Sequence, residues 1–185
     1  SVKTAEYLNE FIKNGYANLD PVKDEFLNGK AATLLGGSWN IADLEKSNLN
    51  WGVSYFPVAD DGKAASPTGD WAAAITKDSK NPDAAGKFLQ WAMDSDNIAS
   101  YASAVAKPAS RTSSYEKMEG WDSGARALMK WQLQNTGVSR PRTPSYSVLS
   151  TDFSTAMLNI FSGSNAKDEL DNVAKNFDEN YEMYY

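Results

Sequence analysis

Hydrophobic residues near the amino terminus recur at the spacing of one helical face. Leu8, Phe11 and Ile12 share a face of residues 2–14, and Gly15 follows as a signal for the end of a helix. The same spacing, read with proline and asparagine as start signals and glycine as a stop signal, predicts further helices. These cover residues 20–29, 39–46, 81–92, 96–104, 122–134, 147–162 and 166–182.

Short apolar runs lie between several of these helices and predict strands. The runs cover residues 31–35, 51–56 and 71–76, and Pro57 ends the second one. Because the predicted strands alternate with helices, the pattern indicates an α/β fold.

Proline, glycine and serine mark the segments predicted to lack regular structure. Residues 60–63 are typical of a turn, and residues 66–69 are typical of an irregular loop. Residues 108–114 are rich in serine and form the clearest predicted linker. The two prolines in residues 140–144 exclude a helix and predict an extended crossing segment.

The amino-acid composition excludes several classes of binding partner and catalytic site. The 185 residues are 42% hydrophobic and 12% aromatic, which is ample for a packed core. A net charge of −6 with scattered lysines and arginines argues against nucleic acid as a partner. The chain has no cysteine and no histidine, so disulfides, thiolate nucleophiles and Ser-His-Asp arrangements are excluded. No cofactor or metal is predicted, and no apolar run approaches the ~20 residues of a membrane-spanning helix.

The run Gly36-Gly37-Ser38-Trp39-Asn40 is the first candidate for a binding site. Its glycines permit a tight turn after the predicted strand, Ser38 is a predicted N-cap, and ligands bind at the carboxyl ends of strands in open α/β sheets. The Trp39 indole either faces a small polar ligand or packs beneath its own helix. The backbone amides of Gly37 and Ser38 are candidates for binding a hydroxyl or an anion.

Short blocks of residues follow one another in a recognisable order along nearly the whole chain. They are Gly15-Tyr16, Phe26–Ala32, Gly37-Ser38-Trp39, Trp51-Gly52-Val53, Phe56-Pro57-Val58, Gly69-Asp70-Trp71, Ser79–Pro82, Ala84-Ala85, Lys87-Phe88-Leu89, Lys107-Pro108-Ala109, Gly163 and Leu170-Asp171. In this order they resemble the carboxyl-terminal half of extracellular solute-binding proteins of sugar ABC transporters, and the maltodextrin-binding branch is similar. The resemblance implies a type II periplasmic-binding-protein-like fold, of which this chain is the carboxyl-terminal portion with helices packed on a small mixed sheet.

The resemblance also implies a division of the chain. In intact family members, residues 1–70 would belong to the carboxyl lobe, residues 71–110 would cross to the other lobe, and residues 111–185 would return as carboxyl-lobe helices with a hinge-proximal segment. An additional amino-terminal half with the export signal is implied, so we expect the chain to be a fragment. An extracellular or periplasmic location follows, with a lipoprotein-type tether to the cell surface through that missing part.

Two further groups of site residues are implied by the resemblance. Asp70 and Trp71 follow a glycine where the family has a loop that lines the cleft, and Asp70 would accept hydrogen bonds from vicinal hydroxyls. The alternatives are a turn residue for Asp70 and an ordinary strand aromatic for Trp71. Arg140, Arg142 and Tyr146 lie in the part that resembles the hinge-proximal segment, and the alternative is that both arginines are solvated linker charges.

The remaining tryptophans are predicted to be structural, because their apolar spacing is typical of a core. They are Trp51, Trp91, Trp121 and Trp131.

The expected function is that of a binding module rather than an enzyme. It would bind a carbohydrate, an oligosaccharide given the aromatic content, in an interlobe cleft and deliver it to the membrane subunits of an ABC importer. The missing amino-terminal half, as a separate chain, is a further candidate partner. Two alternatives remain: a glycan-cleaving hydrolase with paired carboxylates, for which no acid/base motif is present, and a partner-binding domain with exposed aromatics.

Overall fold

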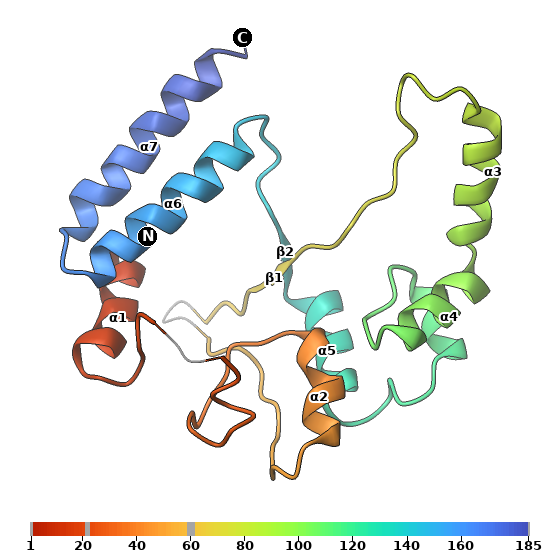
Figure 1. The fold of residues 1–185 in the computed structure, drawn as a ribbon, viewed down its shortest axis with the longest axis horizontal. Coiled ribbons are helices and arrows are strands. Elements are labelled where there is room, and N and C mark those ends of the chain that lie inside the picture. Colours follow the sequence, from red (N-terminus) through yellow and green to blue (C-terminus); the bar gives the residue numbers. More distant parts are fainter. Residues whose placement is uncertain (1, 21–22, 59–61, 185) are drawn as a thin grey trace. The chain divides into compact units, whose positions relative to one another are not determined.

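The computed structural model describes residues 2–20, 23–58 and 62–184. Its contacts divide the chain into two compact units: unit 1 comprises residues 1–25 with 141–185, and unit 2 comprises residues 26–140. Helices dominate unit 1, whereas unit 2 combines helices, long irregular segments and a small sheet (Figure 1). The predicted boundaries at residues 70 and 110 refer to intact family members and stay a prediction.

Unit 1 is a cluster of three helices close to those predicted. They are α1 (Val2–Lys13), α6 (Tyr146–Phe161) and α7 (Ala166–Glu182). Helices α6 and α7 lie side by side, and α1 packs against both (Figure 1). The buried centre contains Ala5, Ile160 and Ala166, and Asn9 Nδ2 donates a hydrogen bond to the Ile160 carbonyl over 3.0 Å. Tertiary packing of amphipathic faces therefore holds these helices together.

The core of unit 2 lies around a helix and a 3₁₀ helix, which are α4 (Ser95–Ala104) and η2 (Thr112–Lys117). Its buried members are Ile98, Ala99, Ala102, Ala109, Tyr115, Met118 and Trp121. Ser114 Oγ donates to the Ser95 carbonyl over 2.9 Å, and burial raises the pKa of the Tyr115 hydroxyl. The predicted linker over residues 108–114 is therefore only partly irregular, because Ala109 and Ser114 are buried and η2 begins at Thr112, whereas residues 110–113 are exposed.

The predicted helix over residues 39–46 is present in two parts, a 3₁₀ turn followed by an α-helix. They are η1 (Ser38–Asn40) and α2 (Ile41–Lys46). Ser38 is not the N-cap: Gly37 takes that position, and its N–H donates to Asn40 Oδ1 over 3.1 Å. The Asn40 side-chain oxygen thus accepts from the N–H of the residue at the N-cap position, as in the second half of a capping box.

An ion pair joins α2 to α5 (Gly124–Asn135). Both terminal nitrogens of Arg126 donate to the Glu45 carboxylate, and the Nη2 to Oε2 distance is 2.8 Å. The hydrogen bond from the arginine lowers the pKa of Glu45, and the same bond raises the pKa of Arg126. This two-point contact links α2 to the helix that carries Trp131.

The sheet of unit 2 consists of two parallel strands, β1 (Ser66–Thr68) and β2 (Gly137–Ser139). Ser66 pairs with Gly137 and Thr68 with Ser139. Pro67 has no backbone N–H to donate, but it is tolerated in β1 because both strands of a two-stranded sheet are edge strands. A proline at an edge can direct its nitrogen away from the partner strand, so no hydrogen bond between the strands is lost. The loop predicted over residues 66–69 is therefore strand over most of its length.

The strands predicted over residues 31–35, 51–56 and 71–76 are wrong. In the part of the chain that the structure describes, these runs lie outside any ladder and form irregular chain. An apolar run becomes a strand only when a neighbour supplies hydrogen bonds, and the ladder of unit 2 forms elsewhere. The two described strands pair in parallel, whereas the resemblance implied a small mixed sheet.

One further helix matches its prediction, and another predicted helix is not formed. Helix α3 (Pro82–Ala92) begins with proline at its first position after Asn81, as predicted. The predicted helix over residues 20–29 is wrong where it is described: residues 23–29 form turns, and Asp24 has a φ of 60°, which an α-helix excludes. Pro21 and Val22 lie outside the described residues, as do residues 60 and 61 of the predicted turn. No helix within the described ranges is long and apolar enough to cross a membrane.

Candidate binding site at the strand ends

The carboxyl ends of β1 and β2 bring together two segments that are far apart in the sequence. Because the strands are parallel, Gly69 and Arg140 both follow directly after the same edge of the sheet. A Cβ atom on Gly69 would lie 3.3 Å from Arg140 Nε, so the guanidinium group packs directly over this glycine. This edge is where ligands bind in open α/β sheets.

Asp70 and Trp71 extend from that edge into solvent. Asp70 Oδ1 accepts a hydrogen bond from the Trp71 N–H over 2.8 Å, so the carboxylate fixes the backbone of its own turn. Trp71 is 93% exposed. An exposed indole ring and a carboxylate therefore follow Gly69 in the chain, and the Arg140 guanidinium group lies over that glycine, although the strand expected to begin at Trp71 does not form.

Trp39 lies in the same unit and is 68% exposed. A Cβ atom on Gly37 would lie 2.3 Å from the nearest Trp39 ring carbon, so the ring lies against the glycine backbone. The Gly37 N–H already donates to Asn40 Oδ1, and a ligand at this amide would have to displace the asparagine. The sequence left two possibilities for Trp39: an indole that faces a ligand, or an indole packed beneath its own helix. Its exposure does not fit the second possibility.

Arg142 and Tyr146 belong to unit 1, whereas the candidate residues above belong to unit 2. Arg142 is exposed in the predicted extended segment, which contains no helix up to Thr143. Tyr146 is half-buried and begins α6. The roles of both residues stay predictions.

The tryptophans predicted to be structural divide into two groups. Trp121 is 2% exposed, at the centre of the unit 2 core, as predicted, and Trp51 is half-buried. Trp91 is 61% exposed, because α3 buries none of its residues. Trp131 is 45% exposed and contacts Tyr55, with ring centroids 4.8 Å apart.

The candidate residues differ in the chemical groups that they offer. They provide an aromatic face, a carboxylate and a guanidinium group, which together suit a ligand with apolar faces and hydroxyl rims. Within residues 2–20, 23–58 and 62–184, no three metal-ligating side chains of the His, Cys, Asp or Glu type lie together. Sequence reasoning singled out Asp70, Trp71 and Arg140 separately, but no signal showed that β1 and β2 would place them at one edge.

The chain is similar to known binding proteins. It is 24% identical over 168 residues to the maltodextrin-binding protein of Bacillus subtilis (strain 168), covering 88% of this chain and 40% of that protein. A solute-binding protein from Staphylococcus aureus in complex with maltose superposes with a TM-score of 0.70 at 20% identity, over 100% of this chain and 49% of that one. A maltose-binding periplasmic protein from Listeria monocytogenes, also in complex with maltose, gives 0.72 at 20% identity, over 100% and 50%.

These likenesses establish the fold, and the chain spans about half the length of the relatives that it matches. The relatives are binding proteins by name. The family model for bacterial extracellular solute-binding proteins matches residues 1–130. With its sequence, fold and family model in agreement, this chain belongs to the bacterial extracellular solute-binding proteins.

Proposed function

We propose that this chain forms part of a carbohydrate-binding protein that takes a maltodextrin, an oligosaccharide of glucose. The support comes from the relatives, one of which is named for maltodextrin and two of which hold maltose. A glucose chain presents apolar C–H faces and vicinal hydroxyls, which an indole, a carboxylate and a guanidinium group recognise.

The single observation that carries the proposal is the edge of the sheet at Gly69 and Arg140. Trp71 is almost fully exposed there, so the faces of its indole are available to stack on the apolar face of a sugar ring. Asp70 supplies acceptors, and Arg140 supplies donors in a planar fork. Trp39, with Gly37 and Ser38, is proposed as a second contact in unit 2.

The proposed role is capture and delivery without covalent chemistry. The sugar would be bound between two lobes whose closure presents the complex to the membrane subunits of an ABC importer. We propose an extracellular or periplasmic location with a surface tether, and a contribution of Arg142 and Tyr146 from unit 1. The remainder of the binding cleft would come from a part of the protein that this chain does not span.

Titration calorimetry with maltose, maltotriose and maltohexaose tests the proposal, using the protein in its full-length context. Trp71→Ala should weaken binding about tenfold or more, because loss of a buried aromatic contact costs about 1.5 kcal/mol or more. Arg140→Gln should weaken it as well, since a neutral amide cannot form the charged, forked contact.

Trp91→Ala is the matched control, because Trp91 is another exposed tryptophan, on α3, that lies outside the proposed site. Its affinity for maltotriose should stay within about twofold of the unaltered protein, the range expected of a distant surface change. If no sugar binds, or if Trp71→Ala and Trp91→Ala bind equally, the proposed site is wrong.

A further inference from the structure

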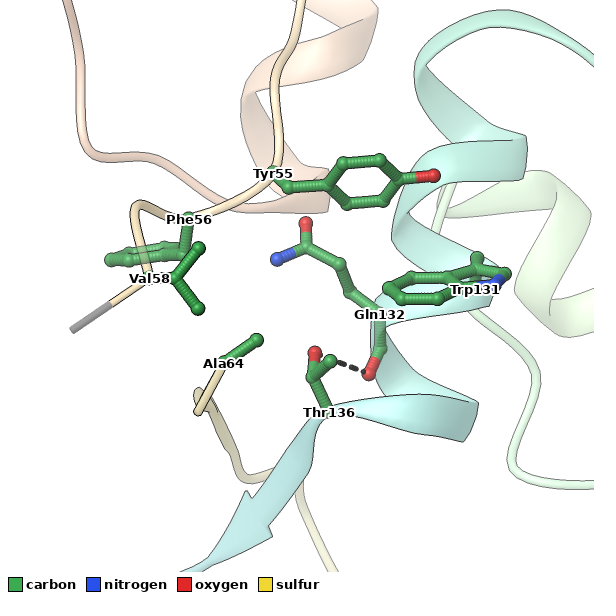
Figure 2. A pocket seen from close by; sticks show the side chains of 7 residues that line it. All are labelled: Tyr55, Phe56, Val58, Ala64, Trp131, Gln132 and Thr136. Carbon is green, nitrogen blue, oxygen red and sulfur yellow. Dashed lines mark hydrogen bonds between the residues drawn. The ribbon is translucent and has the colours of Figure 1, made fainter. Parts of the chain in front are cut away.

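A hollow of about 180 Å³ lies in unit 2, between the irregular segment before β1 and the end of α5. We name it the Tyr55–Trp131 hollow. Its lining residues are Tyr55, Phe56, Val58, Ala64, Trp131, Gln132 and Thr136. Figure 2 shows Tyr55, Phe56 and Val58 on the irregular segment and Trp131 with Gln132 on the helix that faces them.

This hollow is separate from the candidate sugar site. Ala64 lies just before β1, and Thr136 lies just before β2. The hollow is therefore at the amino ends of the two parallel strands, whereas Gly69 and Arg140 follow their carboxyl ends. One short sheet separates two sites of different chemistry within the same unit.

Aromatic rings form one wall of the hollow. The centroids of Tyr55 and Trp131 lie 4.8 Å apart with their planes tilted by 59°. Both rings stay about half exposed, at 52% and 45%, so they have faces that contact with each other does not cover. Aromatic faces of this kind attract another ring through edge and offset contacts.

Two of the polar side chains that line the hollow, Gln132 and Thr136, form hydrogen bonds within the protein. Gln132 Nε2 donates to Ser66 Oγ over 2.7 Å, and Thr136 Oγ1 donates to the Gln132 carbonyl over 3.1 Å (Figure 2). A sugar ring entering the hollow would lose hydration of several hydroxyls and find few partners, which is costly. An apolar ring loses no such hydration, so the lining favours it.

From these contacts we infer that the Tyr55–Trp131 hollow is a binding site for a small planar aromatic molecule of one ring. Its volume is similar to the roughly 150 Å³ of an engineered apolar cavity that binds benzene. The ring would lie against Tyr55 and Trp131, with Phe56 and Val58 covering its other side. This site is independent of the proposed function, because it shares no residue with the sugar site.

Fluorine NMR of fluorobenzene, added to the intact chain, tests the inference. We expect line broadening that saturates with a Kd on the order of 1 mM, within the usual affinity per atom for so small a ligand. Ala64→Phe should fill the hollow with a ring of its own and weaken fluorobenzene binding tenfold or more, while leaving the walls in place.

Ala104→Phe is the matched control, because Ala104 is an exposed alanine of α4 that does not line the hollow. It should bind fluorobenzene as the unaltered chain does. Excess maltose should leave the fluorobenzene signal unchanged, which separates this site from the sugar site. Absence of saturable broadening, equal binding by the Ala64→Phe chain, or displacement by maltose would each overturn the inference.

Discussion

Gly36 and Gly37 make room for neighbouring side chains, and unusual backbone angles are not the reason for them. Gly37 is extended, with φ −137° and ψ −174°, which any residue adopts. A Cβ atom on Gly36 would lie 2.6 Å from Asn40 Oδ1, and one on Gly37 would lie 2.3 Å from the Trp39 ring. The sequence therefore pointed to the right residues for a different reason, since we expected glycine to permit a tight turn.

Replacing Gly37 by alanine should move the Trp39 indole without unfolding the protein. The clash is with the far end of an exposed ring, so the loss of stability should stay below about 1 kcal/mol. In protein labelled with 5-fluorotryptophan, one fluorine resonance should shift clearly. Gly52→Ala is the control, because a Cβ atom there meets nothing within 4 Å, and it should leave that resonance in place. An unshifted spectrum for Gly37→Ala would mean that the ring does not rest on this glycine.

The site residues differ in how far the sequence alone could predict them. Trp71 stood out because an aromatic residue followed a glycine and an aspartate, and it is exposed as a binding residue must be. The proximity of Arg140 to Gly69 depends on a parallel pairing between residues far apart in the chain. Neither Ser66-Pro67-Thr68 nor Gly137-Val138-Ser139 has the composition of a typical strand, so this proximity could not be predicted.

At the scale of elements, most helices were predictable, apart from the one expected over residues 20–29, and strands were not. Helices α6 and α7 carry their own periodicity and caps, such as Asn165, whose side chain accepts from two backbone N–H groups of α7. A strand depends on a neighbour that local sequence does not identify. The apolar runs 31–35 and 51–56 satisfied the local pattern but have no such neighbour among the residues that the structure describes.

Gly137 at the start of β2 should be intolerant of any side chain. A Cβ atom there would lie 2.6 Å from the Leu133 carbonyl oxygen and 2.9 Å from a Thr68 methyl group. Because a backbone atom cannot move aside easily, Gly137→Ala should lower the free energy of unfolding by about 1–3 kcal/mol. Urea denaturation measures this, with Gly52→Ala as the control that should change little. Equal midpoints for the two variants would contradict the close packing of β2 on α5.

The Glu45–Arg126 pair between α2 and α5 should make stability depend on pH. The pKa of Glu45 is lowered in the folded chain, so its contribution is present above the ordinary glutamate pKa and is lost as pH falls through the folded value. Glu45→Gln should therefore cost about 0.5 kcal/mol at pH 7, as expected for a partly exposed pair. This difference should vanish in acid. A double-mutant cycle with Arg126→Gln isolates the pair, and a cost that persists after Glu45 is protonated would assign it to packing instead.

At the scale of the whole molecule, the backbone amides should differ widely in their protection from hydrogen exchange. Interior amides of α6 and α7 are hydrogen-bonded in packed helices, whereas residues 51–58 lie outside helices and strands. Hydrogen exchange followed by mass spectrometry should show slow exchange in α6 and α7 and fast exchange in residues 51–58. Strong protection of residues 51–58 would show that this run is paired as a strand in solution, as its apolar pattern first suggested.

The pairing of Ser66 with Gly137 closes a long loop that contains α3, α4, η2 and α5. The chain-entropy cost of such a closure grows only with the logarithm of loop length, so doubling the loop adds about 0.6 kcal/mol. Extra residues inserted at 77–80, an exposed to half-buried stretch before α3, should consequently leave both the ladder and the α4–η2 core intact. This stretch is therefore a position where a reporter peptide can be grafted into the protein.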